Sequence, residues 1–162
     1  MNAAFKRTDK FTLFVVTFFG SGMAPKAPGT FGSLLAMLLA WPLLTVSFRF
    51  CFAWLALFVF FAAIPFVNKA LRDTELDDPG WIVIDEAAGQ WTAFAFVAPE
   101  TLLSHLWMLP LGFIFFRFFD ILKPLGIHQL EKLPKAWGVM ADDILGGIYS
   151  GIVLLLISKF FL

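Results

Sequence analysis

The strongest constraint on this chain is the alternation of long apolar runs with short polar segments. The chain is 60% hydrophobic and only 15% charged over 162 residues, too few charges to cover a soluble domain of this size. A helix of about 20 apolar residues crosses the roughly 30 Å bilayer core. We therefore predict one all-α domain over residues 1–162, a multi-pass membrane helical bundle of about five spans. The runs cover residues 31–46, 50–67, 81–97, 102–122 and 139–162.

A shorter apolar run, residues 11–19, follows a basic segment that contains Lys6, Arg7 and Lys10. A run this short cannot cross the bilayer core, so it predicts an interfacial or re-entrant helix. The basic head, the short apolar centre and the small residues that come next also resemble a cleaved signal peptide. Asp9 in the head, and the polar loop that follows, favour the uncleaved helix.

Two pairs of adjacent acids stand near the start of apolar runs, Asp85 with Glu86 and Asp142 with Asp143. Ionised groups at a membrane boundary are costly to desolvate and are usually kept for a task. Helix neighbours point about 100° apart, so each pair can offer one group to a site and one to its flank. With Asp120 these oxygen ligands suit Mg²⁺ or Mn²⁺. The simpler alternative is that the acids favour the positive end of a helix dipole.

Arg117, Asp120 and Lys123 are spaced three residues apart, which places them on one face of a helix. Arg117 could then bind a phosphate in bidentate fashion, and Lys123 could act as a point charge. Alternatively, Arg117 and Asp120 form an ion pair that lowers the cost of insertion, while the Lys123 side chain reaches toward water.

The loop at residues 20–33 is rich in glycine, proline and small polar residues. The prolines and glycines of residues 24–32 predict irregular backbone there, with Thr30 as the N-cap of the following helix. Free backbone N–H groups and a helix N-terminus are suited to holding an anion. Gly29, Thr30 and Ser33 are therefore candidate phosphate-binding residues, although Gly/Pro-rich loops are also common between apolar segments.

The distribution of lysine and arginine predicts which side of the membrane each loop faces. Basic residues are frequent before residue 11 and in segments 68–80 and 123–138, and they are sparse in the intervening connections. The positive-inside rule places the richer segments in the cytoplasm. With five spans, all four polar clusters then fall on the cytoplasmic side. The net charge is zero and no basic run is present, so we expect no nucleic-acid partner.

The remaining reactive residue types favour packing roles. Cys51 is the single cysteine and lies within an apolar run, which excludes an intrachain disulfide and a thiolate metal cage. His128 falls in a polar loop and His105 near the opposite face, and neither is accompanied by a carboxylate pattern that would indicate a metal or catalytic site.

Four sequence blocks together resemble the phosphatidylglycerophosphatase A family, over nearly the whole chain after Phe11. The blocks are GSGMAPKAPGTFGS at residues 20–33, IDEAAG at 84–89, FRFFDILKP at 116–124 and ADDILGG at 141–147. The resemblance implies a Mg²⁺-dependent lipid phosphatase of the bacterial cytoplasmic (inner) membrane. Such an enzyme converts phosphatidylglycerophosphate to phosphatidylglycerol and inorganic phosphate, a step of phospholipid biosynthesis. The family residues carried over are Pro28, Gly29, Thr30, Ser33, Asp85, Glu86, Arg117, Asp120, Lys123, Asp142 and Asp143.

These residues suggest a division of roles in which the carboxylates of both acid pairs hold Mg²⁺. Arg117 and Lys123 would neutralise the phosphoryl oxygens, and Asp120 could orient the attacking water. The number of metal ions and of subunits stays open. A small membrane transporter or channel that uses interfacial carboxylates is the alternative, but it would place its acids near the bilayer midplane.

Overall fold

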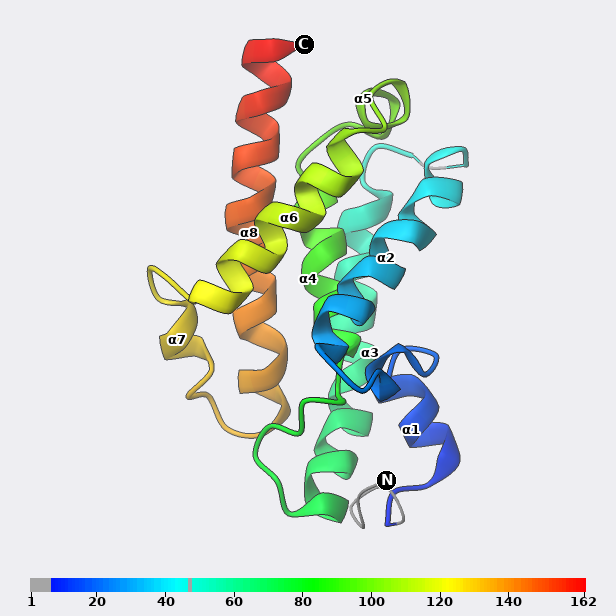
Figure 1. Cartoon of the computed structure of the whole chain (residues 1–162), viewed down its shortest axis with the longest axis vertical. Helices are drawn as coiled ribbons and strands as arrows, with labels where there is room; N and C mark the ends of the chain where they lie inside the picture. The colour runs from blue at the N-terminus through cyan, green and yellow to red at the C-terminus, as the bar shows by residue number, and fades with distance from the viewer. Residues whose placement is uncertain (1–6, 47) are drawn as a thin grey trace.

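The computed structural model describes residues 7–46 and 48–162, so Lys6 of the basic head and Ser47 of the 47–49 connection lie outside the described residues. Within the described residues the structure is helical and contains no strand, which confirms the all-α prediction. The elements are α1 (Lys10–Val16), a 3₁₀ turn (Ser21–Met23), α2 (Pro28–Leu44), α3 (Cys51–Thr74), α4 (Ile84–Phe94), α5 (Pro99–Ser104), α6 (Met108–Leu122), α7 (Ile127–Leu130) and α8 (Ala136–Phe161) (Figure 1).

Helix α4 is the centre of the bundle and packs against α2, α3, α6 and α8. Each of its residues from Ile84 to Phe94 is buried except Thr92. Small residues permit this enclosure, because a Cβ added at Gly89 would lie 2.5 Å from the Phe116 ring of α6 and 2.6 Å from the Asp143 carbonyl of α8. The close approach of the three helices therefore depends on the absence of a side chain at Gly89.

Two helices of the described residues, α3 and α8, are long and apolar enough to cross a membrane. Helix α2 is shorter, with 17 residues, and α4 and α6 have 11 and 15. At a rise of 1.5 Å per residue, α4 covers only about 16 Å of the roughly 30 Å core. Five full-length spans are thus not confirmed.

The predicted span at residues 102–122 is divided into α5 and α6. Pro110 lacks a backbone N–H and is best accommodated in the first turn of a helix, although α2 and α3 contain Pro42 and Pro65 in their interiors. It stands in the first turn of α6, which begins at Met108. A helix running through from Leu102 would have placed Pro110 in its interior and lost a backbone hydrogen bond.

Helix α3 extends beyond its predicted end at residue 67 into the expected loop 68–80. It continues through Lys69 and Arg72, which are good helix formers, and stops at Glu75 in a left-handed conformation with φ 56°. Asn68 then accepts a hydrogen bond of 3.2 Å from the backbone N–H of Ala136. This contact joins the last turns of α3 to the start of α8.

The N-terminal segment forms the short helix that the sequence predicts. Asp9 caps α1 by accepting hydrogen bonds from the N–H groups of Phe11 and Thr12, and it also forms an ion pair with Lys69 of α3. The carbonyl of Val16 accepts a 2.9 Å hydrogen bond from the N–H of Val83, directly before α4. The segment thus braces the chain that leads into α4.

The start of α2 differs from the prediction. Its N-cap is Ala27 and its first residue is Pro28, so Thr30 lies inside the first turn rather than at the cap. Residues 28–32 are helical, contrary to the expected irregular backbone, because a proline at the first helical position loses no intrahelical hydrogen bond.

The four predicted polar clusters meet at one end of the bundle, away from the C-terminus. Figure 1 shows the starts of α2, α4 and α8 and the end of α6 in the lower half of the molecule. The predicted clusters belong to the starts of α2 and α4, the end of α6 and the first part of α8, where Asp142 is the seventh residue.

Candidate functional site

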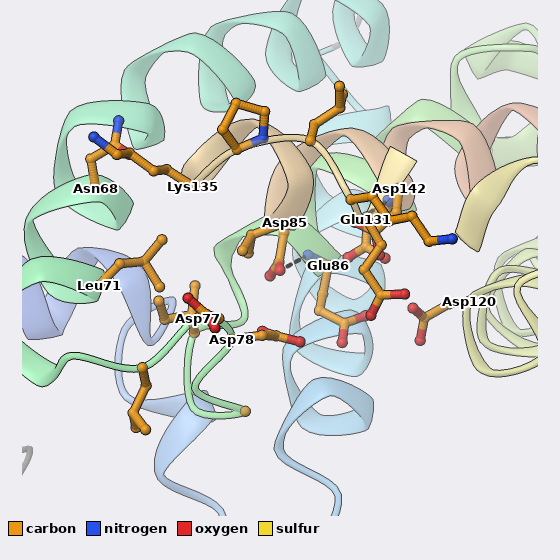
Figure 2. Close-up of a pocket in the computed structure, with 18 of the residues that line it drawn as sticks. Asn68, Leu71, Asp77, Asp78, Asp85, Glu86, Asp120, Glu131, Lys135 and Asp142 are labelled. Carbon is orange, nitrogen blue, oxygen red and sulfur yellow. Dashed lines mark hydrogen bonds between the residues drawn. The ribbon is translucent and has the colours of Figure 1, made fainter. Parts of the chain in front are cut away.

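A cavity of about 710 Å³ opens at this end of the bundle. Its walls are the starts of α4 and α8, the end of α6, the loop between α3 and α4, and the segment between α7 and α8. Figure 2 shows acidic side chains from several of these elements directed into the same space. The predicted site residues among its lining are Asp85, Glu86, Asp120, Lys123, Asp142 and Asp143.

Three carboxylates converge in the cavity, Glu86 from α4, Asp120 from α6 and Asp143 from α8. One oxygen from each lies within 4.8 Å of the others. We call these three residues the carboxylate cluster. Glu86 and Asp143 are 9% and 4% exposed, so their charges are largely shielded from water. Three negative groups this close and this buried repel one another strongly unless cations neutralise them.

Arg117 supplies part of that neutralisation. Its guanidinium forms ion pairs with Glu86 and, at 2.9 Å, with Asp120. One guanidinium cannot balance three ionised carboxylates, so the cluster keeps an excess of negative charge that a divalent cation would offset. The donor set is all oxygen, which suits a hard ion such as Mg²⁺. The cluster therefore fits a divalent metal, both in charge and in ligand type.

The two acid pairs adopt the same local geometry. Asp85 accepts the N–H of Glu86 at 3.0 Å, and Asp142 accepts the N–H of Asp143 at 3.0 Å. The second member of each pair belongs to the carboxylate cluster, and the first lines the cavity beside it. The four predicted metal ligands are thus divided, and Asp120 joins Glu86 and Asp143 in the tightest group.

Lys123 bridges two acids at the edge of the cavity. Its ammonium lies 2.8 Å from Asp142 and 3.1 Å from Glu131. Partial burial lowers the pKa of Lys123, but hydrogen bonding to Asp142 and that carboxylate's charge outweigh burial, so the pKa lies above its ordinary value. The hydrogen bond from Lys123 lowers the pKa of Glu131. Lys123 is therefore charged and held beside the carboxylate cluster.

Glu131 was not among the predicted site residues, and His128 was interpreted as passive. Nδ1 of His128 lies 3.0 Å from a carboxylate oxygen of Glu131, and Glu131 follows His128 by three residues in the chain. The spacing of the two residues was the one sequence signal of this contact. The approach of Glu131 to Lys123 depends on a loop in which Lys123, Leu125 and Gly126 have positive φ, and the sequence does not indicate that loop's shape.

The N-terminal loop contributes to the site by supporting Glu86. Ser33 lies with its hydroxyl 3.0 Å from a Glu86 carboxylate oxygen. A Cβ at Gly29 would collide with the same carboxylate and lie 3.3 Å from Arg117. None of Gly29, Thr30 and Ser33 lines the cavity itself. Gly29 and Ser33 reach the carboxylate cluster through Glu86.

Gln90 lies one helical turn after Glu86 on α4 and is fully buried. Neither its amide nitrogen nor its amide oxygen has a hydrogen-bond partner among the described residues, and the same is true of Nε of Arg117. A buried amide without a partner is costly.

Fold and site together define an all-helical protein with a carboxylate-lined, metal-compatible cavity at one end of an apolar bundle. Residues 14–158 match the model of the family described as Phosphatidylglycerophosphatase A. The chain belongs to the phosphatidylglycerophosphatase A family, and it is a phosphatase.

The relatives cover nearly the full chain. A Haemophilus influenzae protein named Phosphatidylglycerophosphatase A is 38% identical over 89% of this chain and 86% of its own length. An Escherichia coli protein of the same name is 30% identical over 86% of this chain and 79% of its own length. A Bacteroides thetaiotaomicron protein named "Putative phosphatidylinositol-3-phosphatase" is 37% identical over 92% of this chain and 94% of its own length. No solved structure matches the chain.

Proposed function

We propose that this protein hydrolyses the terminal phosphate of phosphatidylglycerophosphate in a Mg²⁺-dependent reaction, giving phosphatidylglycerol and inorganic phosphate for phospholipid biosynthesis. The observation that carries the proposal is the convergence of Glu86, Asp120 and Asp143 from three helices, with an excess of negative charge. Membership of the family and the names of two relatives support the substrate.

The ligands that we assign to the metal are Glu86, Asp120 and Asp143, with Asp85 and Asp142 beside them. When bound, Mg²⁺ would supply positive charge to the phosphoryl oxygens as negative charge develops in the transition state. Ser33 and Arg117 would hold Glu86 in place through the contacts described above. Such support limits ligand movement, on which metal affinity depends.

Lys123, which lines the cavity, would bind phosphate oxygens, whereas Arg117 does not line the cavity and would hold Glu86 and Asp120. Hydrolysis forms a bond from phosphorus to a water oxygen and breaks the bond from phosphorus to the glycerol oxygen, which leaves with a proton. Asp85 lines the cavity and is 8% exposed, and we assign it to orient the water and accept its proton. Asp120, assigned to that role from the sequence, takes a place in the carboxylate cluster.

The positions of the basic residues support a membrane orientation. Lys10, Lys69 and Arg72 belong to the end of the bundle that carries the cavity, as do the lysines of segment 131–135, whereas Lys159 is at the other end (Figure 1). The positive-inside rule then supports a multi-pass protein of the bacterial inner membrane whose cavity faces the cytoplasm. Acids gathered at one end do not favour a transporter or channel, which would need them near the midplane.

Phosphate release by purified protein in detergent tests the proposal. Phosphatidylglycerophosphate should be hydrolysed with Mg²⁺, and hydrolysis should stop with excess EDTA and return when Mg²⁺ is restored. Ca²⁺ serves as the matched control ion, because it prefers a larger and more flexible oxygen shell. Undiminished turnover in EDTA would contradict the metal assignment, and hydrolysis of phosphatidylinositol 3-phosphate alone would contradict the substrate.

A further inference from the structure

The cations near the cavity fall into two groups. Arg117 and Lys123 are ion-paired with carboxylates of the site. Arg72, Lys132 and Lys135 line the cavity, as Lys123 does, but in the described part of the chain none of the three has a carboxylate within 4.0 Å. This second group, which we call the outer cations, therefore has no direct ion-pair partner among the described residues.

The outer cations come from the two elements that meet at Asn68, with Arg72 one helical turn after Asn68 and Lys132 three residues before Lys135. Arg72 lies in the last turn of α3, and Lys132 and Lys135 lie in the segment before α8. The hydrogen bond from Ala136 to Asn68 holds these two elements together. Figure 2 shows Asn68 and Lys135 at one side of the cavity and Asp120 at the other.

The cavity is larger than one phosphate requires. Its volume of about 710 Å³ is in the range of sites that enclose a whole small ligand, about 300–1,000 Å³. The charges at its two ends also differ in kind. Asp78 interacts with Lys123 and Asp120, and so adds to the acidic end. Glu75, which is ion-paired with Arg7, and Asp77 line the cavity as well, and they reduce the attraction of the outer cations for an anion.

We propose that Arg72, Lys132 and Lys135 form a second anion subsite, which binds a phosphodiester while the carboxylate cluster holds the phosphate to be hydrolysed. The inference rests on the proposed function, because the terminal phosphate and the internal diester of phosphatidylglycerophosphate are separated by one glycerol. A headgroup that spans the cavity engages both ends. Phosphatidate carries a phosphate monoester and no diester, so it engages the acidic end alone.

The test compares two substrates in mixed micelles of the same detergent and charge. The variant Lys132→Gln/Lys135→Gln removes two outer cations, and Arg72→Gln removes the third. The control, Lys10→Gln/Lys26→Gln, removes two exposed lysines that do not line the cavity. We expect KM for phosphatidylglycerophosphate to rise about tenfold in the double variant, with kcat unchanged, since screened charge contacts each contribute a few-fold. KM for phosphatidate should change less than twofold.

Three results would overturn the subsite. Equal losses on both substrates would show a general electrostatic effect, and an equal loss in the control would show micelle attraction. Unchanged kinetics in all variants would show that the outer cations do not bind substrate. Failure of the proposed function looks different, because wild-type protein would then leave phosphatidylglycerophosphate intact. Thermal midpoints equal to wild type would show that the variants are folded.

Discussion

Replacement of Gly147 by alanine tests whether the packing of α4 against α8 sets the geometry of the carboxylate cluster. A Cβ at Gly147 would collide with the carbonyl of Gly89 and lie 2.8 Å from Cβ of Thr92, both on α4. Ordinary contacts of a Cβ begin near 3.4 Å. Because backbone atoms cannot rotate away, the helices must separate by about half an ångström or more.

The energetic cost follows from two opposing effects. Overpacking of this kind costs about 1–3 kcal/mol, and alanine in a helix recovers about 0.5–1 kcal/mol relative to glycine. We expect a net loss of about 1–2 kcal/mol in the free energy of unfolding. The separation also moves Asp143, one turn earlier on α8, away from Glu86 on α4. Since a 1 Å misplacement can cost about a hundredfold in rate, activity should fall at least tenfold.

Gly146 provides the matched control. It is the neighbouring residue of the same helix, but a Cβ there would meet its nearest atoms at 3.8 to 3.9 Å, which is ordinary contact. Gly146→Ala should therefore keep or slightly raise the thermal midpoint and leave phosphate release unchanged. Both variants are compared by thermal unfolding in detergent and by initial rates. Equal stability and equal activity in the two variants would refute the argument that α4–α8 contact controls the site.

Two further predictions concern single side chains. Asp85→Asn and Asp142→Asn should each abolish phosphate release while the protein still fractionates with membranes, and full activity in either variant would remove that residue from the site. Gln90→Leu should raise the thermal midpoint, because it replaces a buried amide without a described partner, worth about 1–3 kcal/mol, by an apolar group of similar size. A lower thermal midpoint would show that the Gln90 amide forms a stabilising hydrogen bond in the membrane-embedded protein.

The apolar runs predicted the helices well where hydropathy alone decides their length. Residues 139–162 correspond closely to α8, and 31–46 to α2. Hydropathy could not show that α4 is enclosed by protein, because a run buried among helices and a run facing lipid have the same composition. Hydropathy also did not indicate the break before α6, where Pro110 stands in the first turn of the helix.

The candidate site was predictable in its residue types and less so in its partners. The acid pairs were placed at one location by the distribution of basic residues over five predicted spans, and the structure brings them together although five full-length spans are not confirmed. Which member of each pair joins the carboxylate cluster depends on helix rotation, which adjacent residues do not reveal. The approach of Asp120 to Glu86, and of Glu131 to Lys123, depends on helix crossing and loop shape. These long-range features have no local signal in a single sequence.

The enclosure of α4 has a consequence for how lipid composition acts on this protein. In the proposed membrane protein, changes in membrane thickness would act on segments long enough to match the hydrocarbon layer, here α3 and α8, and would change their tilt. The short α4 is surrounded by protein and has no acyl chains to match. A change in membrane thickness should therefore affect Glu86 only indirectly, through the tilt of the helices around α4. A change in the tilt of α8 would move Asp143 relative to Glu86.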